Sequence, residues 1–138
     1  YLFRGKRTDY KVWVYGYLIG NNVIVGEVVD FDDDYFNTEF WYKVDPETVG
    51  QFTGLTDKNG TKVFEGGIIK APSGRLYVVI WSTWIHDEKR NKFLTDRYEF
   101  TGWCISKDGI NPRDTLDCET LEGEVIGNIY DNHEPIKP

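Results

Sequence analysis

The chain has 138 residues, of which 16% are aromatic, and a formal net charge of −7 at pH 7. This length supports one domain with its own hydrophobic core and excludes two full-sized domains, so we expect a single β domain over residues 1–138. A duplex-binding protein gains most of its affinity by neutralising phosphates with Lys and Arg. The negative charge therefore argues against nucleic acid as a partner, and no apolar run approaches the roughly 20 residues of a membrane span.

Cysteine usage predicts the compartment. The chain has two cysteines, Cys104 and Cys118, and no recognisable secretory leader. Because disulfides are rare in reducing compartments, we expect both thiols to be free and the protein to reside in the cytoplasm.

The first predicted strands form a hairpin. Residues 11–19 (KVWVYGYLI) and 23–29 (VIVGEVV) are rich in β-branched and aromatic residues, and Gly20-Asn21-Asn22 between them is a turn signal. Side chains alternate across a strand, so Trp13, Tyr15 and Tyr17 are expected on one face. Such a row is typical of a core or a subunit interface, and a surface that stacks bases is the alternative.

Residues 30–39 (DFDDDYFNTE) are the most acidic stretch, and we expect an exposed loop there. Asp30, Asp32 and Asp34 alternate like the first ligands of a calcium loop. The pattern then fails, because Tyr35 stands where that loop needs Gly and Trp41 where it needs Glu. The sequence therefore predicts no metal site, with a weak divalent-cation site as the alternative.

Two hairpins are predicted downstream of a strand at residues 40–44 and a short turn at residues 45–48. Asn59-Gly60 separates short runs at residues 51–55 and 61–64, and this dipeptide favours a type I′ turn in which both residues have positive φ. Asp57 is placed to accept hydrogen bonds from the turn backbone. Pro72-Ser73-Gly74 joins an apolar run at Ile68-Ile69 to residues 75–81. We expect structural turns at Asn59, Gly60, Gly66 and Gly74.

Beyond Trp81 the pattern is less regular. We expect residues 82–92 to form a polar hairpin tip, residues 97–105 and 124–130 to form strands, and residues 131–138 to be a frayed tail. Basic clusters occur at Arg4, Lys6 and Arg7, and again at Lys89, Arg90 and Lys92. We interpret both as solvated charges that also protect strand edges from mispairing.

The sequence carries no recognisable catalytic motif. Its histidines, His86 and His133, lie in a predicted hairpin tip and in the tail, and Gly-x-Ser-x-Gly is absent. Neither Cys-x-x-Cys nor a phosphate-binding loop occurs. We therefore predict no catalytic residue, no cofactor and no enzymatic activity. An enzyme with a metal held by carboxylates between Asp32 and Glu39 is the alternative.

A family resemblance emerges from separated segments. They are VDPETVGQFTGL (44–55), DKNG (57–60), VFEG (63–66), FRGKR (3–7) and EVIGNIYDN (124–132). These segments, and their order along the chain, strongly resemble the YopX family of phage and prophage proteins. The part after Trp81 is the least similar. The family usually has Asp where this chain has Gly67. The resemblance implies a mainly β, small-barrel-like fold, an oligomer and a temperate-phage origin, and it implies no known activity.

These observations predict an all-β fold of roughly seven to nine short antiparallel strands forming a small, partly open SH3-like barrel with β-hairpin extensions. We expect a phage protein that acts as a non-enzymatic protein-binding or assembly module, as a homo-oligomer or with a host or phage protein. The alternative is a nucleic-acid-associated accessory protein that uses a local basic and aromatic surface. The candidate binding surface comprises Trp13, Tyr15, Tyr17, Trp81 and Trp84.

Overall fold

Short antiparallel strands make up most of the protein. The structure is a computed structural model that describes residues 1–131, so the predicted tail lies outside the described residues except for Asp131. Strands account for 57% of the described residues and helices for 5%, which confirms the all-β class. The thirteen strands exceed the expected number, because predicted runs are interrupted. For example, residues 23–29 divide at Gly26 into two strands.

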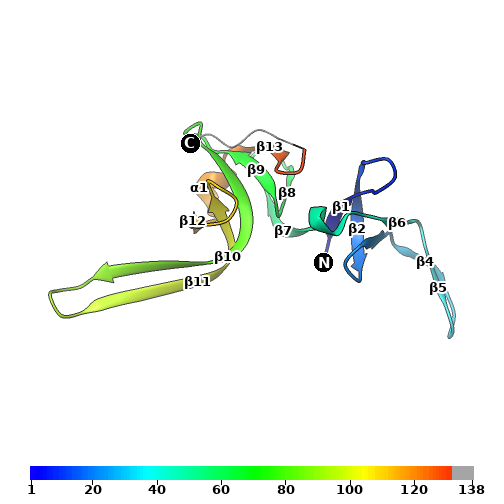
Figure 1. Cartoon of the computed structure of the whole chain (residues 1–138), viewed down its shortest axis with the longest axis horizontal. Coiled ribbons are helices and arrows are strands. Elements are labelled where there is room, and N and C mark those ends of the chain that lie inside the picture. Colours follow the sequence, from blue (N-terminus) through cyan, green and yellow to red (C-terminus); the bar gives the residue numbers. More distant parts are fainter. Residues whose placement is uncertain (132–138) are drawn as a thin grey trace. The chain divides into compact units, whose positions relative to one another are not determined.

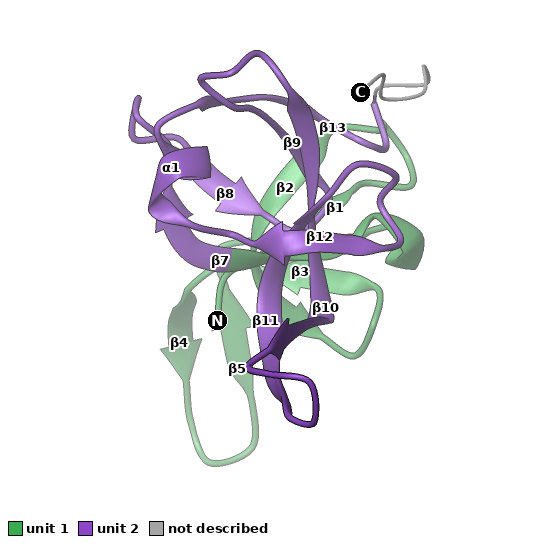
Figure 2. Ribbon diagram, turned by 90° about the vertical axis from the view of Figure 1, so that its left-hand side faces the viewer, with its two compact units in different colours: residues 1–52 green, residues 53–138 purple. Residues whose placement is uncertain are grey.

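The chain divides into two units, coloured separately in Figure 2. Unit 1 spans Tyr1–Phe52, and unit 2 contains the described residues from Thr53 onward. The expectation of one domain over residues 1–138 stays a prediction. It is tested by whether the two units unfold in one cooperative transition.

Unit 1 is built around an antiparallel sheet with the strand order β6-β3-β2-β1, and β1 pairs in turn with the first residues of β7. A separate two-stranded sheet is formed by β4 and β5. The elements are β1 (Phe3–Lys6), β2 (Trp13–Ile19), β3 (Val23–Val25), β4 (Val28–Phe31), β5 (Phe36–Thr38), β6 (Trp41–Lys43), the 3₁₀ turn η1 (Pro46–Thr48) and β7 (Gly50–Thr56).

One face of the unit 1 sheet forms a small core. Ile24 and Val44 are almost fully buried there. Two glycines allow the strands to approach this core. A Cβ at Gly5 would lie 2.9 Å from the Val44 side chain, and one at Gly16 would lie 2.2 Å from the Val25 carbonyl oxygen. The core therefore depends on residues without side chains on β1 and β2.

Unit 2 contains a five-stranded sheet with the order β12-β11-β10-β9-β13. This sheet curls into a half-barrel, which fits the expected partly open barrel (Figure 1). The elements are β8 (Lys62–Phe64), β9 (Gly67–Lys70), β10 (Leu76–Lys89), β11 (Thr95–Ser106), β12 (Pro112–Thr115), the short helix α1 (Cys118–Leu121) and β13 (Glu124–Asn128). Val63, Ile69 and Val79 have no exposed surface and form the centre of the core.

Two predicted loops are strands. Residues 82–92 are not a polar tip, because β10 continues to Lys89 in register with β11 and only residues 90–94 make the turn. The side chains there do not alternate between polar and apolar, so the pairing with β11 and not the local pattern defines the strand. The acidic stretch is likewise no simple loop. Its ends pair as β4 and β5, with Phe31 opposite Phe36.

The turn at Asn59-Gly60 differs from the predicted type. Gly60 has a φ of +80°, whereas Asn59 is not among the residues with positive φ, so the turn is not type I′. The Gly60 amide donates to the Asp57 carbonyl oxygen at 3.0 Å, and the Asp57 amide donates to the Thr61 carbonyl oxygen at 2.9 Å. The strands are thus joined by a longer turn that ends in a left-handed glycine.

Replacing Gly60 with valine is expected to destabilise the protein by about 1–3 kcal/mol, because a β-branched residue is strained at positive φ. A Cβ at this site would touch no other group, so the loss reports backbone strain alone. Urea unfolding measures it, and Gly60→Asn is the control, because Asn tolerates this region better. A Val variant as stable as the parent would contradict the turn geometry.

Candidate interaction surface

The family-like segments of unit 1 are joined by hydrogen bonds. The Lys6 amide donates to the Thr48 hydroxyl at 2.9 Å, and that hydroxyl donates to the Asp45 carbonyl oxygen at 2.7 Å. The Asp45 amide donates to the Lys6 carbonyl oxygen at 2.8 Å. The Asp45 side chain accepts from the Glu47 amide at 3.0 Å, as an N-cap does. Segments 3–7 and 44–55 therefore hold β1 against η1.

Asp57 joins three segments of unit 2. Its side chain is 6% exposed. One carboxylate oxygen accepts from the amides of Asn59 and Thr61, each at 2.9 Å, and the other accepts from the Val125 amide at 2.8 Å. Burial by itself raises the pKa of this carboxyl, but the hydrogen bonds from Val125, Thr61 and Asn59 outweigh burial and lower the pKa. Asp57 thus fixes β13 to the turn before β8.

The remaining family-like segments meet beside β9. Gly67 pairs with Asn128, and the Ile129 amide donates to the Gly66 carbonyl oxygen at 3.0 Å. Gly66 has a φ of +81°, and a Cβ there would lie 3.0 Å from the Tyr130 ring. The buried Asn128 side chain accepts from the backbone amide of Tyr130 at 2.9 Å. All of the family-like segments thus have identifiable roles in the framework.

The most exposed aromatic side chains of unit 2 lie on a long two-stranded arm, residues 81–102. Strand β10 pairs with β9 only at residues 76–78. Strand β11 pairs with β12 only at residues 104–106, with a bulge between residues 105 and 106. Beyond those residues β10 and β11 pair with each other as far as Lys89 and Thr95. Figure 1 shows the arm as the long green-yellow hairpin of unit 2.

One face of the arm carries a row of rings. Trp84 lies opposite Phe100, and His86 lies opposite Tyr98. The Trp84 and His86 rings are stacked with centroids 5.5 Å apart, and the His86 and Tyr98 centroids are 6.4 Å apart. The Trp84 indole nitrogen donates to the Arg113 carbonyl oxygen at 2.9 Å, which fixes the inner end of the row. Tyr98 is 52% exposed, so the outer end is open to solvent.

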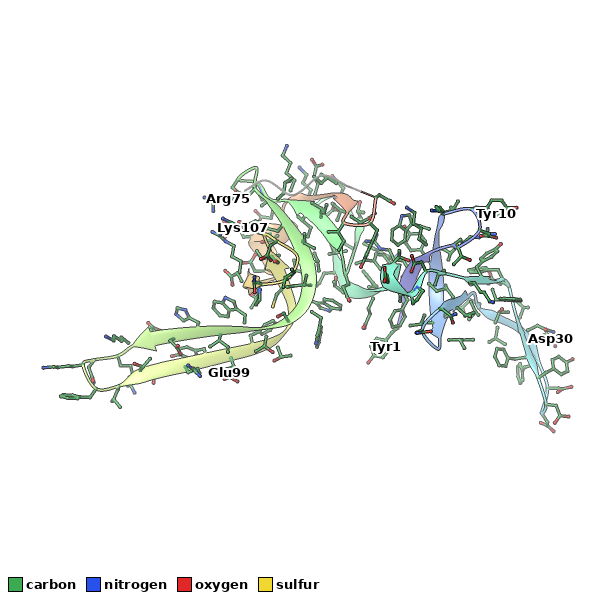
Figure 3. All side chains as sticks on the ribbon, viewed as in Figure 1. Tyr1, Tyr10, Asp30, Arg75, Glu99 and Lys107 are labelled. Atoms are coloured by element: carbon green, nitrogen blue, oxygen red, sulfur yellow. The ribbon has the colours of Figure 1, made fainter. Side chains whose placement is uncertain are left out.

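The other face of the arm contains Trp81 and Ile85, which are more than half exposed. Trp81 packs edge-on against Trp103 with centroids 5.0 Å apart. Trp81 and Trp84 were predicted as parts of one surface, but three positions separate them, and they lie on opposite faces of β10. Figure 3 shows side chains projecting from both faces of the arm, near the labelled Glu99.

The predicted residues of unit 1 lie at alternate positions of β2. Trp13 is half-buried, and Tyr15 and Tyr17 are 50% and 42% exposed. The Arg4 guanidinium lies 4.8 Å and the Lys6 ammonium 6.0 Å from the Trp13 ring. These contacts follow from the register, because Lys6 opposes Trp13 and Arg4 opposes Tyr15. The register thus brings residues of the basic cluster beside the aromatic row, and no local sequence pattern shows which of them meet.

A hydrogen bond restrains the outermost ring of this row. The Tyr17 hydroxyl donates to a carboxylate oxygen of Glu27 at 2.7 Å, and this bond raises the pKa of the phenol. Glu27 follows the buried Gly26 in the two-residue break between β3 and β4. Whether Trp13, Tyr15 and Tyr17 bind a partner stays a prediction.

The two cysteines are free thiols in different surroundings. Cys104 is fully buried in β11, and burial raises the pKa of its thiol. Cys118 is exposed at the start of α1. We expect a thiol reagent to modify one cysteine rapidly in the folded protein and both after denaturation, because the thiolate is the reacting form. Ellman titration measures this, with Cys118→Ser as the control. Rapid modification of both thiols in the native state would contradict the burial of Cys104.

The next features concern ligand-sized hollows and metal ligands among residues 1–131. Unit 2 has a hollow of about 220 Å³ between the Pro72-Ser73 turn, Tyr77 and α1, which is smaller than typical ligand pockets of roughly 300–1,000 Å³. No group of three His, Cys, Asp or Glu residues within residues 1–131 is placed to hold a metal ion. No helix among residues 1–131 is long and apolar enough to cross a membrane.

The chain is thus an all-β protein in which buried turn residues form the framework and exposed aromatic residues lie on strand faces. A family model described as YopX protein matches residues 2–137, nearly the whole chain. The chain belongs to the YopX family, which confirms the resemblance drawn from the separated segments. A search of curated proteins found no match.

Proposed function

We propose that this protein is a phage-type, non-enzymatic binding or assembly module that acts through protein contacts made by the arm. The observation that carries the proposal is the exposed apolar surface of the arm, where Trp81, Ile85 and Tyr98 are 58%, 51% and 52% exposed. Trp81 and Ile85 lie on one face of the arm and Tyr98 on the other, and exposed apolar side chains gathered on a surface mark interaction sites in soluble proteins. Aromatic residues are also enriched in protein interfaces, because they bury a large area with few rotatable bonds.

Four of the five perturbed carboxyl groups within the described residues have a lowered pKa, which supports a role without catalysis, and burial raises the pKa of the fifth, Glu65. Hydrogen bonds from backbone amides lower the pKa of Asp108, with the Asn111 and Ile110 amides contributing most, as those of Val125, Thr61 and Asn59 do at Asp57. A general acid at neutral pH needs a raised pKa instead. Family membership supports the phage-type assignment. The free thiols support the proposed location in the host cytoplasm.

Capture from host lysate tests this function. A tagged chain is incubated with lysate that has been treated with nuclease, and bound proteins are identified by mass spectrometry. The arm variant Trp81→Ser, Ile85→Ser, Tyr98→Ser is compared with the matched surface variant Tyr1→Ser, Ile110→Ser, Ile129→Ser, whose residues are also exposed apolar ones. We expect the arm variant to recover at least about tenfold less of its partner than the parent does, because interface aromatics dominate binding energy. The partner recovered is either a host protein or an untagged copy of the chain.

Two results would overturn the proposal. One is equal capture by the parent and the arm variant while both melt at the same temperature. The other is complete loss of capture after nuclease treatment, which would show that nucleic acid mediates the contact.

Binding to single-stranded nucleic acid is the second candidate, and the face of β1 and β2 specifically favours it. Lys6 and Arg4 lie beside Trp13 and Tyr15 there, and single-strand binders combine cations with stacking rings in this way. Titration of an oligonucleotide against tryptophan fluorescence at two salt concentrations tests it. Tight binding that weakens steeply with salt would support this candidate, and absence of quenching at low salt would remove it.

A further inference from the structure

The hairpin formed by β4 and β5 is acidic and apolar at once. Residues 27–39, the acidic hairpin, contain six carboxylates and no Lys or Arg, against a net charge of −7 for the whole chain. Four of these acids lie within residues 30–34. Phe31 and Phe36 form a cross-strand pair and are 75% and 57% exposed, and Val29 is 61% exposed. The hairpin therefore presents rings and concentrated negative charge together.

The tip of the arm has the complementary composition. Lys89, Arg90 and Lys92 are exposed, and they give residues 89–92 a charge of +3. Two of the three neighbouring acids lie beside an arginine: Arg97 binds Asp87 at 2.9 Å and Arg90 lies 3.4 Å from Asp96, and the third acid is the exposed Glu88. Phe93 and Leu94 are 87% and 54% exposed at the turn. An open hollow of about 600 Å³ lies beside the tip, lined by Tyr98, by the basic Lys89, Arg90 and Arg97, and by the acidic Glu88 and Asp96.

The two surfaces match in both chemistry and arrangement. Each has exposed apolar side chains beside charges of one sign, and the signs are opposite. Stable interfaces commonly combine an apolar centre with a polar rim, and complementary charge fixes which surfaces meet. Every copy of the chain carries both surfaces, so a second copy supplies the partner that each requires.

We propose that the acidic hairpin of one copy docks on the arm tip, residues 89–94, of a second copy. The contact joins two different surfaces, so it is heterologous, and its repetition generates a closed ring or an open filament. The inference rests on the proposed function, because it takes the exposed arm to be an assembly surface and identifies its partner as another copy of this chain.

Charge exchange between the two surfaces tests the inference. The arm variant is Lys89→Glu, Arg90→Glu, Lys92→Glu, which changes residues 89–92 from +3 to −3. The hairpin variant is Asp30→Lys, Asp33→Lys, Asp34→Lys, which changes residues 30–34 from −4 to +2. Asp32 is retained because its carboxylate accepts from the Asp34 amide at 2.8 Å. Sedimentation velocity over a range of concentrations gives the dissociation constants at about 0.1 M salt, where the screening length is roughly 10 Å.

The parent chain is expected to self-associate, and each variant alone to do so at least about tenfold more weakly, because attraction becomes repulsion at several pairs. Mixing the two variants should restore association, since the hairpin of the arm variant meets the unchanged arm of the hairpin variant. The chain carrying all six substitutions should also recover. Lys62→Glu, Lys70→Glu, Arg75→Glu, at exposed sites away from both surfaces, matches the net charge of the arm variant and should associate like the parent.

Circular dichroism and melting temperature show whether each variant is folded. A parent chain that stays monomeric at every concentration overturns the inference, and so does a mixture that associates no better than its components. Neither result touches the proposed function, which is decided by lysate capture with the serine variant of the arm. Capture that is independent of the arm would overturn the function itself, whatever the charge exchange shows.

Discussion

Replacing Asp57 with alanine is expected to destabilise unit 2 by about 3–5 kcal/mol. The substitution leaves the amides of Asn59, Thr61 and Val125 without the acceptors that they have in the native structure. Unsatisfied donors at a buried site are costly because water cannot replace the missing partner. Urea unfolding followed by tryptophan fluorescence measures the loss, since Trp103 packs against the core of unit 2.

Asp108→Ala is the matched control. The Asp108 carboxylate also accepts from several backbone amides, those of Ile110 and Asn111, but Asp108 lies in an exposed loop. Water can satisfy those amides after the substitution, so its effect should be clearly smaller. Equal losses for the two variants would contradict the importance given to the burial of Asp57.

The contribution of Asp57 also depends on pH. Its folded-state pKa is below the ordinary value of 3.8, so ionised Asp57 stabilises the native state most above that pH. The contribution falls as the pH decreases through the folded-state pKa, because the proton then binds both states. The stability difference between the parent and Asp57→Asn should therefore be constant near neutrality and shrink below about pH 4. A difference that grows on acidification would contradict the lowered pKa.

Replacing Gly123 with valine is expected to destabilise the protein by about 3 kcal/mol or more. A Cβ at this position would lie 2.1 Å from the Lys70 carbonyl oxygen and 2.9 Å from the Ala71 Cα. Both groups are backbone atoms at the end of β9, so no side-chain rotation can relieve the overlap. Moving them would disturb the pairing of Lys70 with Glu124 at the start of β13.

Glu122→Val serves as the control for Gly123→Val, because the adjacent Glu122 is exposed and a valine there meets solvent. Equilibrium unfolding of the two variants measures the difference. A Gly123 variant within about 0.5 kcal/mol of the parent would contradict the close approach of β9 and residue 123, because changes of that size are typical of ordinary surface sites.

Local sequence signals predicted much of the fold. Gly20-Asn21-Asn22 and Pro72-Ser73-Gly74 join antiparallel strands as expected, because turn residues and strand alternation act over a few positions. Asp57 was correctly expected to bond the turn backbone. Its second oxygen, which accepts from Val125 at 2.8 Å, could not be predicted, since 68 residues separate the partners and no local pattern encodes that contact.

The extent of the arm was also beyond local prediction. Residues 82–92 have the polar composition of a loop, but a strand exposed on both faces does not need the buried apolar side that usually identifies strands. Pairing with residues 95–102 keeps them extended. The same reasoning explains the acidic stretch, where Phe31 and Phe36 pair although neither is buried.

The candidate surface was predicted in part. Trp81 and Trp84 do lie in one strand, and Trp84, Tyr98 and Phe100 became visible as one row only through the register of β10 with β11. Tyr98 and Phe100 stand at alternate positions of the strand predicted at residues 97–105 and so share a face, but without the register nothing connected them to Trp84. The charge complementarity of the acidic hairpin and the arm tip likewise required knowledge that both are exposed.

Oxidative footprinting of the aromatic side chains in the assembled protein shows directly whether the arm is a contact surface. Hydroxyl radicals label exposed rings. We expect Trp81 and Tyr98 to be protected from labelling in the assembly that is captured from host lysate. Both rings should be labelled freely in the control sample, which is the dilute parent chain. Tyr10, which is 73% exposed and lies outside the arm, provides the internal reference. Equal labelling of Trp81 and Tyr98 in the captured and dilute samples would contradict the claim that the arm is a contact surface.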